Sequence, residues 1–404
     1  MLLFVILSSL AIFLLGILLL RREGLMRDTG RTVLCLVLMA AAVLLRVYLF
    51  DYESLDYKDF LKVWIAFFRD NGGFAALGRS VGNYNPPYLY FLALFSYFNI
   101  DGLVHIKLLS VVFDVLLAWA AMKLCSVFVK GDRLIVCFFA VLFLPTVVLN
   151  GAFWGQCDSI YAFFAVMGIY LALSDRPVGS MLCAAASLAF KLQAVFFLPV
   201  YFVLLLARKI RVKHLFVFPA AYILYLMPAV IAGRPFLETM TLYVSQAGTV
   251  GDALNYNAPS LTSMLSFAGD PAGVSGRLIV LAFAFTLLLC CIAVLCRDRL
   301  SPRVVLCFAL LFCIGIPYLL PHMHDRYFFI AGILLLVLGI AEPLTVPAAL
   351  SAELASLHCY CAYFAKRYFV HPGWGGLLML LALTVCAVCL AVFLKKIKKN
   401  QISS

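Results

Sequence analysis

Residues 51–87 read DYESLDYKDFLKVWIAFFRDNGGFAALGRSVGNYNPP and form the first long polar interruption of an otherwise apolar chain. Four acids of this stretch fall within nine residues, directly after an apolar run: Asp51, Glu53, Asp56 and Asp59. Carboxylates at the end of a membrane span are costly unless water solvates them or the protein uses them. We therefore expect residues 51–87 to mark a functional face.

The composition places the chain in a membrane. Of its 404 residues, 65% are hydrophobic and only 12% are charged, whereas soluble domains carry about 25% charged residues. Apolar runs of roughly 18 or more residues recur along the sequence, and such runs are typical of transmembrane helices. The runs are continuous rather than alternating, which argues against a β-barrel. The sequence predicts an all-α polytopic membrane protein with one domain over residues 1–404.

About thirteen spans are predicted. Two of them are shortened helices between residues 177 and 207, where Lys191 interrupts the apolar run. The first span is interpreted as a retained helix rather than a cleaved signal peptide. The other spans lie at about 2–20, 32–50, 103–123, 133–150, 158–174, 214–232, 277–296, 303–320, 327–342, 346–364 and 374–394.

The basic residues predict the orientation. The net charge is +12, but 19 of the 31 Lys and Arg lie in short clusters between apolar runs. This is the positive-inside pattern rather than a basic face, so we expect no nucleic-acid partner. The pattern places the polybasic tail, 395–404, in the cytoplasm and the loops at 51–102 and 233–276 on the outer face.

The outer loop at 51–102 supplies the candidate base. Residues 59–70 have the spacing of an amphipathic helix lying in the membrane interface, ended by Asn-Gly-Gly at 71–73. Asp59 could cap this helix, whereas Asp56 stands apart from it and is the stronger candidate for a general base. Asp51 and Glu53 are interpreted as the end of a span. Further on, Tyr84 and Asn85 belong to an aromatic turn whose two prolines exclude a helix through it.

The motif WGQCDSIY, residues 154–161, is predicted at an outer helix junction. Gln156 and Asp158 suit sugar hydroxyls, and Trp154 offers a stacking face. The alternative is an interfacial tryptophan followed by a helix cap made by Asp158 and Ser159. The residues leave both interpretations open.

The motif PHMHDRY, residues 321–327, gathers two histidines, an acid and an arginine at the outer end of a span. Arg326 suits a phosphate or pyrophosphate. His322, His324 and Asp325 could form part of a metal shell, but a His-x-His pair is a weak signal. Phosphate binding is favoured, with no cofactor and a divalent metal considered the weaker alternative. Asn257, in the other outer loop, is a further substrate-binding candidate.

Three ionisable residues fall inside predicted spans: Lys107, Asp114 and Lys191. Such residues are functional candidates by default. Lys107 could instead extend to the interface, and Asp114 could pair with Lys191. Lys191 could also neutralise a lipid phosphate, with Gln193 beside it. These alternatives stay open.

Several motifs in order resemble a known family. They are DY..FL..W at 56–64, G.YNPPYLY at 82–90, WGQ.DSIY at 154–161, FKLQA with LPV at 190–200 and P.MHDRYFF at 321–329. Together they resemble bacterial GT-C membrane glycosyltransferases related to the mannosyltransferases of GPI-anchor synthesis. Two residues separate Asp56 from Asp59 where the family often has DxD or ED, and Asp325 stands where glutamate is common.

The resemblance implies an inverting transfer of a hexose from a polyprenyl-phosphate donor to a lipid-linked or glycan acceptor at the extracytoplasmic face. It implies a bacterial cytoplasmic membrane and Asp56 as the base, while the wider acid spacing predicts independence of metal. Membrane lipids are expected partners. The competing hypotheses are a multi-span lipid or solute transporter, a polysaccharide polymerase and a non-catalytic scaffold; a transporter would be expected to show repeats and matched broken spans.

Overall fold

The computed structural model describes residues 1–247, 251, 253–265 and 273–402, and these are almost entirely helical. They form two compact units. Unit 1 comprises residues 1–168, 181–192 and 216–249, and unit 2 comprises residues 169–180, 193–215 and 250–404. Three helical segments contribute residues to both units: α8 (Asp158–Leu173), α9 (Pro177–Phe190) and η4 (Leu192–Phe196), of which Leu192 alone belongs to unit 1.

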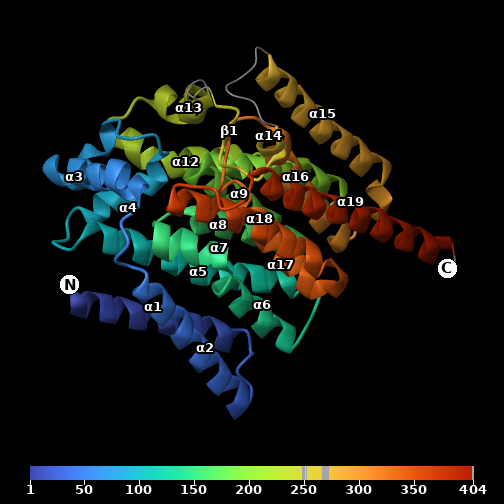
Figure 1. Cartoon of the computed structure of the whole chain (residues 1–404), viewed down its shortest axis with the longest axis horizontal. Coiled ribbons are helices and arrows are strands. Elements are labelled where there is room, and N and C mark those ends of the chain that lie inside the picture. The colour runs from blue at the N-terminus through green and yellow to red at the C-terminus, as the bar shows by residue number, and fades with distance from the viewer. Residues whose placement is uncertain (248–250, 252, 266–272, 403–404) are drawn as a thin grey trace. The chain divides into compact units, whose positions relative to one another are not determined.

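The other helices of unit 1 follow in chain order (Figure 1). They are α1 (Leu2–Arg22), α2 (Thr29–Tyr48), η1 (Tyr57–Leu61), α3 (Lys62–Asp70), η2 (Gly73–Gly78), α4 (Pro86–Phe95), α5 (Gly102–Cys125), α6 (Asp132–Leu142), α7 (Pro145–Val148), η3 (Leu149–Trp154), α12 (Val217–Ile231) and α13 (Phe236–Ala247).

Unit 2 adds further helices and one pair of two-residue strands. They are η4 (Leu192–Phe196), α10 (Val200–Leu206), α11 (Val212–Leu215), β1 (Asn255–Tyr256), α14 (Leu261–Met264), α15 (Val274–Leu295), η5 (Arg297–Arg299), α16 (Pro302–Leu319), β2 (Met323–His324), α17 (Phe329–Ala341), η6 (Pro343–Thr345), α18 (Val346–Ala365) and α19 (Gly373–Ile402).

Seven stretches in the described residues are long and apolar enough to cross a membrane. An eighth is added if α6 and the helical segment from Pro145 to Trp154, bent by 45°, count as one span. The bend follows from Pro145, which cannot continue the hydrogen-bond pattern of α6. The prediction of an all-α polytopic membrane protein is confirmed. The number of thirteen stays a prediction, since several expected spans fall on helices shorter than a full crossing.

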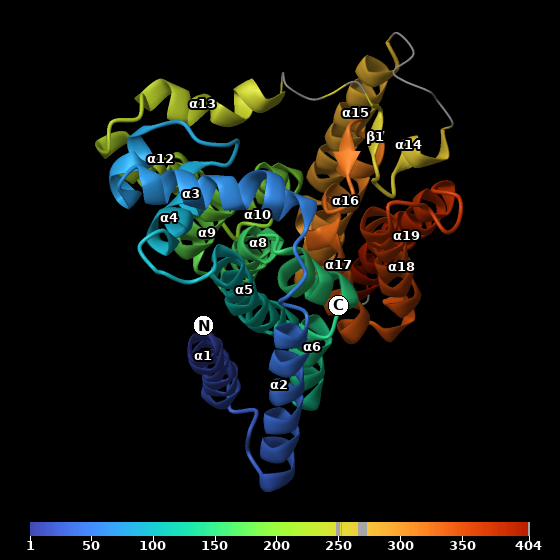
Figure 2. The same cartoon turned by 60° about the vertical axis from the view of Figure 1, so that its left-hand side comes forward.

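Helix α5 is the buried centre of unit 1. In the most apolar 18-residue stretch of α5, two thirds of the residues are buried, whereas the corresponding share in α1 is 17%. Helix α5 contacts both α1 and α6. Asp101 caps its N-terminus by accepting a 2.9 Å hydrogen bond from the backbone N–H of Leu103. Figure 2 shows α2 beside α6, a contact that brings the first connection of the chain close to the start of α6.

The amphipathic segment after Asp56 is confirmed as helical, as a π-helical turn, η1, followed by α3, which ends at Asn71. Its buried side chains, Trp64, Ile65 and Phe68, join a cluster with residues of α4 and α5. The apolar side is therefore partly covered by protein rather than wholly by lipid. Gly82 has φ +63°, and a Cβ there would lie 2.3 Å from the Trp64 ring, so the loop approaches Trp64 closely because it has no side chain at this position.

The two prolines at 86 and 87 lie at the start of a helix. Helix α4 starts at Pro86 with proline in its first turn, where the missing N–H has no intrahelical partner to lose. The predicted turn is confirmed at Tyr84 and Asn85, which lie outside any helix, but it is wrong for residues 86–88, which form the start of α4. Two short helices, α9 and α10, also replace a single long span on either side of Lys191, as expected from its polar interruption.

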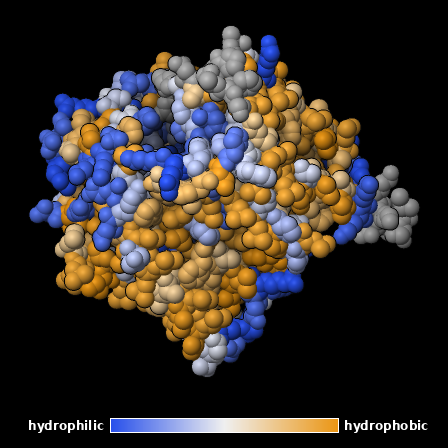
Figure 3. All heavy atoms as spheres, in the orientation of Figure 1, coloured by the Kyte–Doolittle hydropathy of each residue, from blue (hydrophilic) through white to orange (hydrophobic). Residues whose placement is uncertain are grey.

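In unit 2 the buried helix is α16, in which 78% of the residues of the apolar stretch lie inside the protein. It contacts α15, α17 and α19. The strands β1 and β2 pair in parallel, with Asn255 opposite Met323 and Tyr256 opposite His324. The pairing brings the loop before α14 next to the PHMHDRY motif. Much of the surface visible in Figure 3 is apolar, as expected for helices that face lipid.

Candidate functional site

A buried ammonium group holds the loop that leads to Asp56. The Nζ atom of Lys107, on α5, donates to the backbone carbonyls of Leu49, Phe50 and Tyr52 at 3.0, 2.8 and 2.7 Å. Lys107 has no exposed surface, so the interpretation of a side chain extending to the interface is wrong. The lysine instead satisfies backbone carbonyls of the residues that directly follow α2.

Asp56 is half-buried and held from the WGQ motif. Its Oδ2 accepts a 3.0 Å hydrogen bond from Trp154 Nε1 and another from Gln156 Nε2. Charge-assisted hydrogen bonds of this kind fix the orientation of a carboxylate. The first acidic loop and the WGQ motif, about 100 residues apart in sequence, therefore form one cluster in unit 1.

The backbone of the WGQ motif is shaped to make this contact. The π-helical turn η3 ends at Trp154, and Gly155 follows with φ +79°, a conformation that favours glycine. Ser54 Oγ donates to the Trp154 carbonyl at 2.8 Å, and Ser110 Oγ donates to the Gln156 carbonyl at 2.7 Å. These bonds tie the motif to the acidic loop on one side and to α5 on the other.

Tyr57, the next residue after Asp56, anchors the loop to the start of α5. Its hydroxyl donates a 3.1 Å hydrogen bond to Asp101 Oδ1. Burial, together with the negative charge of Asp101, raises the pKa of the Tyr57 phenol, so the phenol stays a neutral donor. Tyr52 stacks on Phe153 with ring centroids 3.9 Å apart, which adds an aromatic contact between the loop and η3.

Asp158 and Lys191 form a buried ion pair. Asp158 Oδ1 accepts from Lys191 Nζ, and Oδ2 accepts from Asn150 Nδ2 at 2.7 Å. The hypothesis that Asp114 pairs with Lys191 is wrong. Asp114 binds Arg46 Nε at 2.9 Å instead, and it also accepts from Ser159. The first residues of the WGQCDS motif therefore contact Asp56. Its last two residues contact two buried ion pairs: Asp158 is part of the pair with Lys191, and Ser159 bonds to Asp114 of the pair with Arg46.

The remaining acids of the loop lie apart from this cluster. Asp51 and Asp59 are exposed, and Glu53 lies 3.9 Å from Lys58. Tyr84 makes edge contacts with the rings of Trp64 and Tyr88. Asn85 is fully buried, and its Nδ2 donates to Tyr222 on α12 at 3.0 Å. Trp154 is only 1% exposed, so the contact its indole makes is with Asp56 rather than with an open surface.

Unit 2 contains a second cluster around Asn257. Its Nδ2 donates to Asp325 Oδ2 at 3.0 Å and to the Cys359 carbonyl at 2.8 Å. Tyr368 donates to Asn257 Oδ1 at 2.6 Å. Asn257 adopts φ +65°, which asparagine tolerates better than most residues. The predicted residues Asn257 and Asp325 therefore lie together, linked through the side-chain amide.

The histidines of PHMHDRY have separate partners. His322 Nδ1 lies 2.7 Å from the Ala253 carbonyl, and Nε2 lies 3.2 Å from Ser275 Oγ. His324 stacks on Tyr256 with ring centroids 4.9 Å apart. Arg326 is 17% exposed, with its Nε 3.6 Å from Asp325 Oδ1. Gln193 is half-buried on η4, and its Oε1 has no hydrogen-bond partner within the described ranges.

Sequence reasoning missed Arg46, Asn150 and Arg234. Arg46 lies inside the predicted second span, and that position was the available signal, since an arginine there needs a buried partner. Asn150 donates to Asp158. Its polar amide at the end of an apolar run also indicated that it needs a buried hydrogen-bond partner. Arg234 is 2% exposed, and its Nη2 donates to Ser80 at 3.0 Å. Burial lowers the pKa of Arg234.

Within the described residues, no group of three or more His, Cys, Asp or Glu is arranged to hold a metal ion. Metal independence itself stays a prediction. The outer loop predicted at 233–276 lies partly outside the described residues.

The chain matches the model of a known protein family. Residues 83–321 match the model of glycosyltransferase family 87. The matched region starts beyond Asp56 and includes the WGQ motif, Lys191 and Asn257. No curated protein matches the chain.

Proposed function

Because the chain belongs to glycosyltransferase family 87, a family of GT-C-type membrane glycosyltransferases, we propose that it transfers a hexose such as mannose from a polyprenyl-phosphate donor. The acceptor is a lipid-linked sugar or a glycan. The family match favours a transferase over the transporter, polymerase and scaffold hypotheses. The chain is a glycosyltransferase; the donor, acceptor and catalytic residues named below are proposals.

One observation carries the assignment of the base. Asp56 is the acid of the outer loop whose carboxylate is held by side-chain donors of a second motif, Trp154 and Gln156. A general base must be held within hydrogen-bond reach of the proton that it removes, so a fixed carboxylate suits the role better than an exposed one. Asp59 is exposed on η1, which makes it the weaker candidate.

The proposed step is a single displacement. Asp56 accepts the proton of an acceptor hydroxyl while that oxygen attacks the anomeric carbon of the donor sugar. The bond between the anomeric carbon and the phosphate oxygen breaks, and the polyprenyl phosphate leaves with the electron pair. Attack from the face opposite the phosphate inverts the anomeric configuration.

Negative charge grows on the phosphate as it leaves, and cationic donors stabilise such charge. Arg326 supports this role by its charge and its partial exposure, and His322 and His324 are further candidates. The basic clusters support an outward-facing site, with the polybasic tail in the cytoplasm and the protein in a bacterial cytoplasmic membrane.

The test is a donor panel on the purified full chain in proteoliposomes. Polyprenyl-phosphate mannose, glucose and galactose are compared with the corresponding nucleotide sugars, each radiolabelled in the hexose. We expect label to reach a lipid or glycan acceptor from one of the polyprenyl phosphates only. Transfer from a nucleotide sugar, with none from any lipid phosphate, would overturn the proposed donor class.

A further inference from the structure

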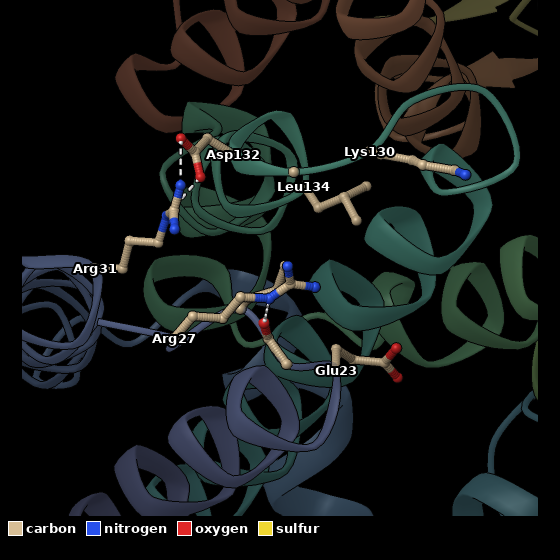
Figure 4. Close-up of a pocket in the computed structure, with 9 residues that line it drawn as sticks. Glu23, Arg27, Arg31, Lys130, Asp132 and Leu134 are labelled. Atoms are coloured by element: carbon tan, nitrogen blue, oxygen red, sulfur yellow. Dashed lines mark hydrogen bonds and ion pairs between the residues drawn. The ribbon is translucent and has the colours of Figure 1, made fainter. Parts of the chain in front are cut away.

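A cavity of about 210 Å³ opens in unit 1 where α1 ends and where α2 and α6 begin. Its polar lining comes from the connection between α1 and α2 and from the residues just before α6 (Figure 4). The charged residues of the lining are Glu23, Arg27, Arg31, Lys130 and Asp132. The cavity is lined by residues of the segments 23–31 and 130–134, none of which takes part in the Asp56 cluster.

The acids of the cavity already have cationic partners. Glu23 accepts from Lys123 Nζ at 2.7 Å and from Trp119 Nε1 at 3.0 Å. Asp132 accepts two hydrogen bonds from the Arg31 guanidinium, at 2.7 and 3.1 Å, in the forked geometry drawn in Figure 4. Arg31 also pairs with Asp28 at 2.8 Å, so its guanidinium is shared between two carboxylates, whereas Glu23 has Lys123 as its own cationic partner.

Two cations of the lining are left over. Arg27 Nε donates to the Gly24 carbonyl at 2.7 Å, but no carboxylate in the described residues pairs with its guanidinium. Lys130 likewise takes part in no ion pair within the described part of the chain, and both side chains are exposed. With Lys123 and Asp28 included, four cations face three carboxylates around the cavity, so one positive charge is in excess. The two groups without a carboxylate partner in the described residues are a guanidinium and an ammonium, and proteins use both to bind phosphate.

We expect lipid headgroups near the cavity. Helices α1 and α2 are both candidate membrane spans, and the cavity is at the ends that they share. Exposed apolar side chains continue along both helices directly from it: Leu14 and Leu18 on α1, and Val33 and Val37 on α2. If the phosphate of a lipid occupies the cavity, its acyl chains can pack against these side chains. A soluble anion has no acyl chains and would leave the same side chains uncovered.

We propose that this cavity binds the phosphate of an anionic glycerophospholipid, held by Arg27 and Lys130, with the acyl chains along α1 and α2. The lipid comes from the leaflet at the basic face of the protein, where anionic headgroups attract Lys and Arg. Inorganic phosphate shares the headgroup chemistry but lacks the acyl chains. The site is independent of sugar transfer and would fix the first two helices against α6.

The experiment is a lipid titration of the purified full chain in detergent, followed by thermal unfolding. The probes are dioctanoyl phosphatidylglycerol, dioctanoyl phosphatidylcholine and inorganic phosphate. We expect a saturable rise of Tm with phosphatidylglycerol, at least ten-fold weaker binding of phosphatidylcholine, and no rise with inorganic phosphate at the same concentrations. The double variant Arg27→Gln/Lys130→Gln should bind phosphatidylglycerol about 25-fold more weakly, since each basic residue near a membrane surface contributes about a five-fold factor.

A matched control removes two charges from the same face. Arg21→Gln/Arg22→Gln changes the last turn of α1 outside the lining and should stay within about three-fold of the wild-type affinity. Leu134→Trp fills the cavity without changing any charge and should abolish the Tm rise. Equal affinity in wild type and Arg27→Gln/Lys130→Gln, or an equal loss in the Arg21/Arg22 variant, would overturn the site. An equal Tm rise with inorganic phosphate, or equal affinity for phosphatidylcholine, would overturn an anionic lipid as its ligand.

Discussion

Trp154 donates its indole N–H to Asp56 across 98 residues of sequence, at 3.0 Å. The bond joins the motif matched by the glycosyltransferase family to an acid that lies ahead of the matched region. It gives Asp56 a fixed direction that the exposed acids of the same loop lack. The proposed role of Asp56 as the base depends on this hydrogen bond, and the effect of removing the bond can be measured.

The first prediction concerns the indole N–H. Trp154→Phe keeps an aromatic ring but removes one of the two donors to Asp56 Oδ2. A hydrogen bond to a charged group is worth about 1.5–3 kcal/mol, so we expect kcat to fall by about ten-fold or more with little change in KM. Steady-state transfer kinetics measure both constants.

Trp119→Phe is the matched control for that variant. Trp119 also donates its indole N–H to a carboxylate at 3.0 Å, but the acceptor is Glu23. We expect this variant to keep the wild-type kcat even if it loses some stability. A similar fall of kcat in both variants would mean that Trp154 acts through general stability and not through Asp56.

The second prediction concerns Lys107. Lys107→Met keeps most of the side-chain volume but leaves three backbone carbonyls without their ammonium donor, and each unsatisfied buried group costs about 1–3 kcal/mol. We expect a lower Tm in detergent and reduced transfer activity together. Lys62→Met, on the exposed side of α3, should leave both unchanged. A wild-type Tm for Lys107→Met would contradict the proposed anchoring of the loop.

The third prediction separates two roles for Lys191. Removing one partner of a buried ion pair destabilises a protein by about 3–5 kcal/mol, whereas replacing both partners is much less harmful. If Lys191 serves mainly to pair with Asp158, then Lys191→Met and Asp158→Asn should each lower Tm strongly, and the double variant should recover part of the loss. A normal Tm with lost activity in Lys191→Met would instead indicate a substrate phosphate at Lys191.

The fourth prediction is metal independence. Asp56 is directed to Trp154 and Gln156, while Asp59 is exposed, so the two acids are not arranged as a pair that bridges a metal ion. We expect EDTA to leave the rate of the purified enzyme unchanged, and added Mg²⁺ or Mn²⁺ to have no effect. Loss of activity with EDTA, followed by recovery with one of these ions, would show the prediction to be wrong.

The local pattern of the chain predicted most of its helices. Continuous apolar runs marked α1, α2, α5, α15, α16 and α19, and the spacing of Trp64 and Phe68 predicted the amphipathic helix α3. The interruption at Lys191 predicted the division into α9 and α10. These features depend on residues that are close in sequence, so the spacing of apolar residues along the chain indicates them directly.

The partners of the charged residues were less predictable, because they depend on contacts between distant segments. One alternative was a pair of Asp114 with Lys191, but packing places Arg46 against Asp114 and Asp158 against Lys191. An interfacial position was one alternative for Lys107, yet the residues after α2 bring three carbonyls within its reach. For Trp154, a stacking face for a sugar and an interfacial tryptophan were both left open, and only the fold shows that its indole reaches Asp56.

The most direct test of the central claim is the initial rate of hexose transfer by Asp56→Asn, compared with wild type and with Asp51→Asn. Asparagine keeps the shape of the side chain but cannot accept the proton, and general base catalysis contributes about 10²–10⁴-fold. We expect Asp56→Asn to lose at least 100-fold in rate with an unchanged Tm, while Asp51→Asn, an exposed acid of the same loop, stays close to wild type. Wild-type transfer by Asp56→Asn would contradict the account, and a loss in Asp59→Asn instead would move the base to Asp59.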